Sequence, residues 1–210
     1  MKSSHFLLIL ILPLFLSARN TEKLYLSGTG ADNTVAWEFI CSAGQNSGKW
    51  TTIRVPSCWE QEGFGAYNFG RDEMENRLNE TGTYRTDFTV PPSWKGKQVN
   101  IVFEGVMTDA RVTINGKQAG PVHQGAFYPF RYDITELIRI GRENKLEVFV
   151  RKHSEHPGIN QAERHADYWV FGGIFRPVYL EALPLENIRK VAVDARADGS
   201  FLADLTISGL

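Results

Sequence analysis

The chain has 210 residues and a formal net charge of −1, because 23 basic residues are balanced by 24 acidic ones. This balance excludes the strongly basic face that nucleic-acid binding requires, and it gives no polybasic patch for a membrane surface. Apolar residues make up 42% of the chain and charged residues 22%, which is typical of a globular protein and excludes a disordered one. The 12% aromatic content and the 19 glycines favour strands and tight turns over a helix bundle.

Residues 1–18 have the pattern of a cleavable secretory signal peptide. Lys2 supplies a positive charge, and an apolar run broken by one proline extends from Phe6 to Leu16. As a helix this run would span about 16 Å, roughly half of the ~30 Å bilayer core, so it is too short to cross a membrane. A small Ser-Ala pair follows where a signal peptidase would cut. We therefore expect a periplasmic or secreted protein.

The cysteines and histidines do not form a metal-ligand pattern. Cys41 and Cys58 are too few for a disulfide scaffold or a cysteine zinc site. In an oxidising compartment they either pair or remain two separate buried thiols. His153 and His156 stand three residues apart just before Pro157, without an evident third ligand. We therefore expect no metal ion and no cofactor.

Most of the mature chain has the pattern of β-strands separated by turns. Asn115-Gly116 supplies a hairpin turn, because both residues tolerate a positive φ. The spacing of strands and turns favours an antiparallel sandwich or a jelly roll. Apolar and polar residues alternate with a period of two, which predicts strands with one buried and one solvated face, over residues 84–90, 99–103, 110–114 and 146–150.

The segments between these strands hold one predicted helix and two predicted long loops. The residues from Asp133 to Glu136 match a capping box, so a helix is expected to start there and to end near Gly141. Residues 56–82 and 152–173 lack periodicity and are predicted to be long loops. Long loops in compact domains are commonly functional.

The pattern changes after Pro184. Alternation over 191–195, a turn at 198–200 and alternation back over 201–207 predict a hairpin. A lone hairpin is marginal in water, so we expect these strands to belong to a second domain that the sequence enters and does not complete. The predicted organisation is therefore a signal peptide over 1–18, a first domain over 19–184 and the first hairpin of a further domain over 185–210.

Four motifs stand out in chain order: VPSCW at 55–59, FEGV and ARVTINGK within 103–117, FRYDIT and NKLEV within 130–148, and DYWVFGGIFRPVYL at 167–180. Together they resemble the N-terminal sugar-binding domain of glycoside hydrolase family 2, which includes β-galactosidases, β-glucuronidases and β-mannosidases. The resemblance covers about residues 35–183. It implies an all-β fold, a jelly-roll (galactose-binding-like) β-sandwich followed by an incomplete immunoglobulin-like β-sandwich. In the family, a (β/α)₈ barrel then carries the catalysis.

The resemblance implies that this chain contributes to substrate binding and holds no catalytic residue. The two catalytic glutamates of the family lie on barrel strands. Asp167 matches a family residue that hydrogen-bonds a sugar hydroxyl, and the alternative is an Asp that caps a turn. Tyr168 and Trp169 either stack on a sugar face or pack in the core or at a domain interface.

Three asparagines of the first long loop invite a functional interpretation. Asn79-Glu80 has the dipeptide that accompanies the family acid/base, but it lies outside any barrel strand and is not expected to be catalytic. Some relatives use an asparagine of this loop near the substrate. Asn68 and Asn76 are both candidates for that position.

Five residues around Asp167 have an expected structural role or an alternative to one. Gly172-Gly173 is expected to permit a tight backbone bend. Arg176 is expected to form a structural ion pair. Arg164 and His165 either shape a pocket or belong to a solvated loop, and the solvated loop is favoured.

The sequence thus favours the N-terminal, non-catalytic sugar-binding portion of an exported, β-galactosidase-like family 2 glycosidase. Its expected partners are a β-glycoside and the barrel domain of the parent enzyme, with no nucleic acid and no membrane. A stand-alone carbohydrate-binding module, or an interaction domain without hydrolase activity, is the alternative. A homo-oligomer is compatible with either.

Overall fold

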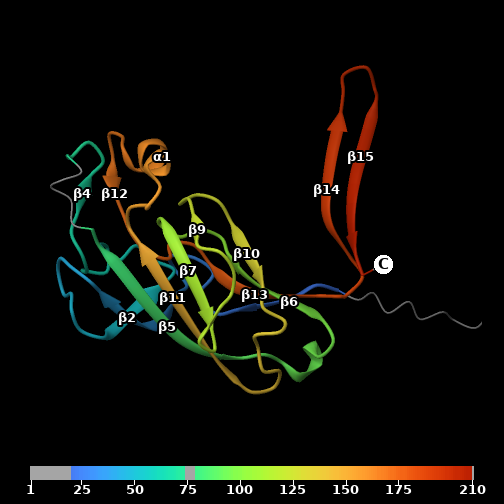
Figure 1. Cartoon of the computed structure of the whole chain (residues 1–210), viewed down its shortest axis with the longest axis horizontal. Coiled ribbons are helices and arrows are strands. Elements are labelled where there is room, and N and C mark those ends of the chain that lie inside the picture. The colour runs from blue at the N-terminus through green and yellow to red at the C-terminus, as the bar shows by residue number, and fades with distance from the viewer. Residues whose placement is uncertain (1–19, 74–78, 210) are drawn as a thin grey trace, which may run out of the picture.

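The computed structural model describes residues 20–73 and 79–209, so the expected signal peptide and Asn76 lie outside the described residues. Two antiparallel sheets form a β-sandwich (Figure 1). The smaller sheet has the strand order β1 (Glu22–Tyr25), β13 (Val178–Leu183), β6 (Gln98–Phe103) and β10 (Phe130–Asp133). The seven-stranded sheet has the order β3 (Thr51–Val55), β2 (Val35–Cys41), β5 (Thr81–Thr89), β11 (Glu143–Arg151), β7 (Asp109–Ile114) and β8 (Lys117–Gln118), and β9 (His123–Gln124) also pairs with β7.

From β5 onward the chain passes back and forth between the two sheets. Strands β5, β7 and β11 belong to the seven-stranded sheet, whereas β6, β10 and β13 belong to the smaller one. This alternation is typical of the jelly roll and confirms the predicted all-β fold class. Short elements complete the described chain: β4 (Asn68–Phe69), a 3-10 turn (Pro92–Trp94), α1 (Pro157–Ile159), a π-helical turn (Asn160–Arg164) and β12 (Trp169–Val170).

The core lies between the sheets, and on the seven-stranded sheet it is built mainly from every second residue of β2, β5, β7 and β11, whereas β6 in the smaller sheet is buried on both faces from Val99 to Phe103. On the seven-stranded sheet, Val148 of β11 is opposite Tyr84 of β5 and Val112 of β7, and all three are buried. The smaller sheet contributes Ile101 and Leu180, which are opposite each other and fully buried. A register shift of one residue would move charged side chains into this core, so burial of one face fixes the pairing.

The predicted strands and the Asn115-Gly116 turn are confirmed. The solvated face predicted for residues 99–103 is wrong, because β6 is an inner strand whose Asn100 and Val102 are buried as well. The helix predicted at Asp133 is also wrong. Asp133 is the last residue of β10, and only one hydrogen-bonded turn follows, with Ile134 buried in the core. The side chain of Asn144 binds both the N–H and the C=O of Arg139, at 2.7 and 3.0 Å. These bonds use the backbone groups that a continuing helix would need.

The predicted C-terminal hairpin is present as β14 (Asn187–Ala195) and β15 (Phe201–Ser208), which pair only with each other among the described strands. Figure 1 shows it projecting away from the sandwich. Apolar side chains of both strands are about half exposed, including Val191 at 54% and Leu205 at 49%. The hairpin therefore gains little from burial, unlike the strands of the sandwich.

We expect hydrogen exchange to separate the hairpin from the sandwich. The amides of Val191 and Leu205 should be at least about tenfold less protected than those of Val112 and Val148, because exposed pairs open locally. Exchange measured by NMR on the whole chain provides this comparison. Equal protection at Val191 and Val112 would show that the hairpin is an integral part of the sandwich.

Candidate functional site

The two segments predicted as long loops pair with each other at one end of the sandwich (Figure 1). Strand β4 in the first segment pairs with β12 in the second, so that Phe69 is opposite Trp169 and Asn68 is opposite Val170. The Gly70 N–H donates to the Tyr168 carbonyl at 2.7 Å and extends the contact. The loops are therefore one structural unit, although 100 residues separate them in the chain.

The structure places the predicted binding residues on the outer surface of this loop pair. Asp167 is exposed, and its carboxylate has no hydrogen-bond partner among the described residues. Trp169 is 53% exposed, and the hydroxyl of Tyr168 donates to the Glu163 carbonyl. The turn-capping alternative for Asp167 thus has no side-chain hydrogen bond to support it within the described chain. Its carboxylate is available to an external donor.

Tyr67 and Phe69 belong to the same surface and were not identified from the sequence. The Trp169 ring meets the edge of Phe69 at a centroid distance of 5.5 Å and that of Tyr67 at 6.1 Å. Tyr67 also contacts Phe171 at 6.1 Å. These rings form an aromatic surface around Trp169, two residues after Asp167 in the chain. The alternation Tyr67-Asn68-Phe69 was the available signal, because it predicts a short strand with both rings on one face.

Asn68 points to the opposite side of the loop pair. It is buried, and its Oδ1 has no hydrogen-bond partner among the described residues. Of the two asparagine candidates, Asn68 is therefore the one that the described structure places in the same unit as Asp167. A buried acceptor without a partner is uncommon and marks a position that a ligand donor can satisfy.

A buried cluster of three charged side chains lies beneath the loop pair. The Lys152 ammonium is 2.7 Å from a Glu60 carboxylate oxygen, 3.1 Å from Glu80 Oε2 and 2.5 Å from the Ala66 carbonyl. All three charged side chains have no exposed area. Three bonds from one ammonium thereby connect three positions of the first loop to the end of β11.

Glu60 extends this cluster to the second loop. Its two carboxylate oxygens accept hydrogen bonds from the Gly172 N–H at 3.0 and 3.2 Å. A side chain at Gly172 would overlap the Trp59 ring, with a Cβ only 2.2 Å from it. Gly173 has φ of +123°, a conformation that favours glycine. The predicted tight bend is confirmed, and its function is to bring the backbone onto Glu60 and Trp59.

Burial changes the pKa of one carboxyl group in the cluster. Burial raises the pKa of Glu60 above its usual value of 4.5, whereas the Lys152 ammonium and the Gly172 N–H oppose that rise. Two carboxylates share one ammonium here, so the second negative charge is incompletely balanced. Glu80 is fully buried in this cluster and ion-paired with Lys152.

Two arginines differ from their predicted roles. Arg164 is 1% exposed, not solvated, and it donates a hydrogen bond to the Phe171 carbonyl. Burial lowers its pKa to about 10. The Arg176 guanidinium contacts the carbonyls of Glu104 and Phe127, at 3.5 and 3.3 Å, and the Phe175 ring, and no ion pair forms with any described residue.

The cysteines that the sequence singled out are unpaired, and His156 caps a helix. Cys41 and Cys58 are separate free thiols. Of the two possibilities that the sequence left open, the structure therefore has two unpaired thiols and not a disulfide. Nδ1 of His156 accepts from the Gly158 N–H at 3.2 Å and caps α1. No cluster of three metal-ligating side chains occurs within residues 20–73 and 79–209. In the same ranges, no helix has the length and hydrophobicity to span a bilayer.

Comparison with known proteins identifies the family. The model of the sugar-binding domain of glycosyl hydrolases family 2 matches residues 31–184, which include the whole loop pair. The chain belongs to glycosyl hydrolases family 2. A β-galactosidase from Thermoanaerobacter pseudethanolicus is 41% identical over 128 residues, which is 60% of this chain and 17% of the relative. A β-glucuronidase from Formosa agariphila is 33% identical over 196 residues, which is 82% of this chain and 20% of the relative.

Solved structures of family 2 proteins share this fold. A putative β-galactosidase from Bacteroides fragilis superposes with a TM-score of 0.61 at 25% identity, over 84% of this chain and 26% of that protein. The β-glucuronidase of Dictyoglomus thermophilum gives a TM-score of 0.61 at 21% identity, over 90% of this chain and 33% of that protein. The chain thus spans about a sixth to a fifth of the length of the curated family 2 relatives above.

Removing the buried ammonium should destabilise this family 2 domain strongly. Lys152→Met leaves Glu60 and Glu80 buried without a cation, and we expect a loss of about 3–5 kcal/mol in the free energy of unfolding. Lys145→Met, on the exposed face of β11, is the matched control and should change stability by less than about 0.5 kcal/mol. Urea unfolding of both variants tests this, and a loss below about 1 kcal/mol for Lys152→Met would contradict the assigned role.

The raised pKa of Glu60 predicts a pH-dependent difference between the wild type and Glu60→Gln. Above pH 4.5 the unfolded chain has released this proton while the folded chain retains it. The contribution of Glu60 to stability therefore falls as pH rises from about 4.5 through the folded pKa. Unfolding free energies of both proteins, measured from pH 4.5 to 7.5, should show the wild-type advantage shrinking. A difference that is constant or grows with pH would contradict the raised pKa, and exposed Glu143→Gln serves as the control.

Proposed function

We propose that this chain is the N-terminal, substrate-binding portion of an exported family 2 glycosidase of the β-galactosidase type. In this proposal it holds none of the catalytic carboxylates and contributes the loop pair to a site that a barrel domain completes. The observation that carries the proposal is the exposed Asp167 carboxylate two residues before Trp169, whose ring forms an aromatic surface with Tyr67 and Phe69, within the residues that match the family.

The chemistry of the loop pair suits a pyranose. The ionised carboxylate of Asp167 accepts hydrogen bonds from sugar hydroxyls, and its charge strengthens each of them. The Trp169 ring offers an apolar face for the C–H groups of the sugar ring. These groups bind and orient, and they transfer no proton.

A neutral sugar suits this site better than a uronate. The Asp167 carboxylate repels a second carboxylate, so an uncharged ring such as galactose is the favoured occupant. The positive group closest along the chain, Arg164, is buried and directed to a backbone carbonyl, so it does not offset Asp167 at the surface. The β-galactosidase-like assignment also draws on the β-galactosidase relative that is 41% identical over 60% of this chain.

The hydrolytic step requires groups that the loop pair does not offer. Retaining glycosidases place two carboxyl groups about 5–5.5 Å apart on either side of the bond that is cleaved. The paired glutamates beneath the loops, Glu60 and Glu80, are fully buried and salt-bridged to Lys152. Neither can reach a glycosidic oxygen, so the catalytic pair of the proposed enzyme lies in its barrel.

Two parts of the proposal concern the ends of the sequence. The apolar start of the chain supports export to the periplasm or the medium. The half-exposed apolar side chains of β14 and β15 support their assignment as the first hairpin of an immunoglobulin-like domain, whose further strands would cover them. The domain boundary would then lie near residue 185.

In the complete enzyme, Asp167→Ala should lower kcat/KM for a nitrophenyl β-galactoside by roughly 10- to 150-fold, the loss of one charged hydrogen bond. The melting temperature should change little, because Asp167 is exposed and makes no side-chain bond in the described chain. Asp204→Ala in the hairpin is the matched control and should leave kcat/KM unchanged. Unchanged kinetics for Asp167→Ala would remove this residue from the site.

Residues 20–210 by themselves should release no nitrophenol from the same substrate, because in this proposal both catalytic carboxylates belong to the barrel domain. The assay uses the purified chain at high concentration over long incubation. Turnover that persists through purification and disappears in a Glu80→Gln variant would contradict the non-catalytic role.

A further inference from the structure

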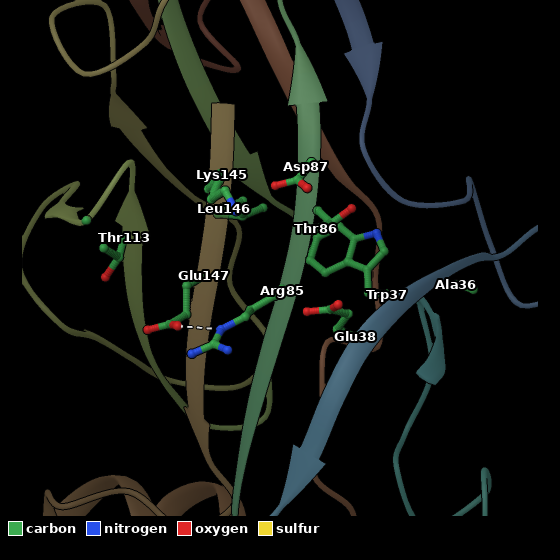
Figure 2. A pocket seen from close by; sticks show the side chains of 11 residues that line it. Ala36, Trp37, Glu38, Arg85, Thr86, Asp87, Thr113, Lys145, Leu146 and Glu147 are labelled. Carbon is green, nitrogen blue, oxygen red and sulfur yellow. Dashed lines mark hydrogen bonds and ion pairs between the residues drawn. The ribbon is translucent and has the colours of Figure 1, made fainter. Parts of the chain in front are cut away.

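A second polar hollow lies on the outer face of the seven-stranded sheet, away from the loop pair. It has a volume of about 530 Å³ and extends over β2, β5, β11 and β7 (Figure 2). Pockets of about 300–1,000 Å³ are typical of small-molecule sites. Nothing in the proposed hydrolase function uses this surface.

The strand register builds the hollow from outward-facing residues. Glu38 of β2 is opposite Arg85 of β5, Arg85 is opposite Glu147 of β11, and Glu147 is opposite Thr113 of β7. This row therefore crosses four strands. Because the opposite faces of the same strands are buried in the core, the register of the row is fixed by the packing of the sandwich.

A second row and small residues define its shape. Asp87 is opposite Lys145, two residue pairs beyond the Arg85–Glu147 pair along β5 and β11 and on the same face of the sheet. Ala36, Thr113 and Gly116 line the hollow with short or absent side chains, whereas long charged side chains rise around them. The side chains of Trp37 and Leu146 are buried in the core and close its floor.

One ion pair is held in a fixed position within the hollow. Arg85 Nε donates to Glu147 Oε2 at 2.8 Å, and the guanidinium lies 4.1 Å from the centroid of the Trp50 ring. Figure 2 shows this pair joined across the two strands. Contacts on two sides restrict the guanidinium, so its remaining donors are pre-organised for a ligand.

Three further charged groups face the hollow without protein partners. In the part of the chain that the structure describes, the side chains of Glu38, Asp87 and Lys145 make no hydrogen bond or ion pair. Asp87 and Lys145 are cross-strand neighbours of opposite charge, an arrangement that normally pairs. Their separation leaves acceptors and donors open toward the same space.

The charge and polarity of the hollow select a neutral, hydroxyl-rich ligand. Three carboxylates and two cationic groups give acceptors and donors with little net charge, which matches hydroxyls that both donate and accept. The excess carboxylate disfavours an anion. A peptide or a lipid would require an apolar anchor, and no outward side chain lining the hollow is more apolar than Ala36.

We propose that this hollow is a carbohydrate-binding site for an uncharged mono- or disaccharide unit, separate from the loop pair. It would hold a neutral saccharide on the rigid sheet while the loop pair serves the hydrolytic site. The proposal goes beyond the hydrolase function and does not depend on it.

The experiment is an NMR titration of residues 20–210 with cellobiose, lactose and mannobiose, each up to about 20 mM, well above the ~1 mM Kd of a weak ligand. Glucuronic acid serves as the anionic comparison. We expect at least one disaccharide to shift the amides of Glu38, Arg85 and Lys145, and glucuronic acid to shift them less. Shifts confined to residues 166–171, or no shifts with any disaccharide, would overturn the proposal.

Two variants test the hollow itself. Asp87→Asn should weaken binding by roughly tenfold or more, because it removes a charged acceptor. Ala36→Leu should also weaken binding, because it fills the hollow without removing any polar group. Asp204→Asn, an exposed aspartate of the hairpin, is the matched control and should bind like the wild type.

Melting curves identify any variant that fails to fold, and exposed substitutions of this kind should change stability by less than about 0.5 kcal/mol. Undiminished binding by folded Ala36→Leu would overturn the proposal. Failure at this surface would leave the kinetics of Asp167→Ala untouched, so the two proposals are tested independently.

Discussion

The buried ammonium of Lys152 is the interaction on which the loop region depends. A cation removed from water must be surrounded by acceptors, and here the acceptors are Glu60, Glu80 and the Ala66 carbonyl. All three come from the first long loop, whereas the ammonium follows β11. Glu60 also accepts a hydrogen bond from the Gly172 N–H. The ion-paired cluster that holds the first long loop therefore also positions the second. A buried network of this kind is stable only when every member is present.

The exposed residues of the loop pair owe their positions to this buried cluster. Once both loops are held, β4 and β12 pair, and their outward residues form the aromatic surface around Trp169. The sheet-face hollow has a different origin, since its charged rows are fixed by the register of β2, β5, β11 and β7. The domain therefore presents one surface held by buried charge and another held by sheet packing. The family of the chain explains a sugar-binding role for the first and does not by itself require the second.

Strands β5, β7 and β11 could be predicted because each buries one face, which leaves a period of two in the sequence. The loop pair could not, because its pairing depends on a lysine and two glutamates whose partners are distant in the chain. One signal was present: Lys152 continues the inward row of Leu146, Val148 and Val150, a position that requires a buried partner. The helix predicted at Asp133 was wrong for a similar reason. The side chain of Asn144, which lies after the predicted helix, hydrogen-bonds the N–H and C=O of Arg139.

The central claim is that the buried charge positions the loops rather than merely stabilising the whole domain. Amide exchange in Lys152→Met tests it most directly, at Gly172 and Gly70 in the loop pair and at Ile134, which bonds the Val99 carbonyl elsewhere in the sandwich. We predict that protection at Gly172 and Gly70 falls at least about tenfold further than at Ile134, because local opening precedes global unfolding. An equal fall at all three amides would contradict the claim and make Lys152 a contributor to global stability alone.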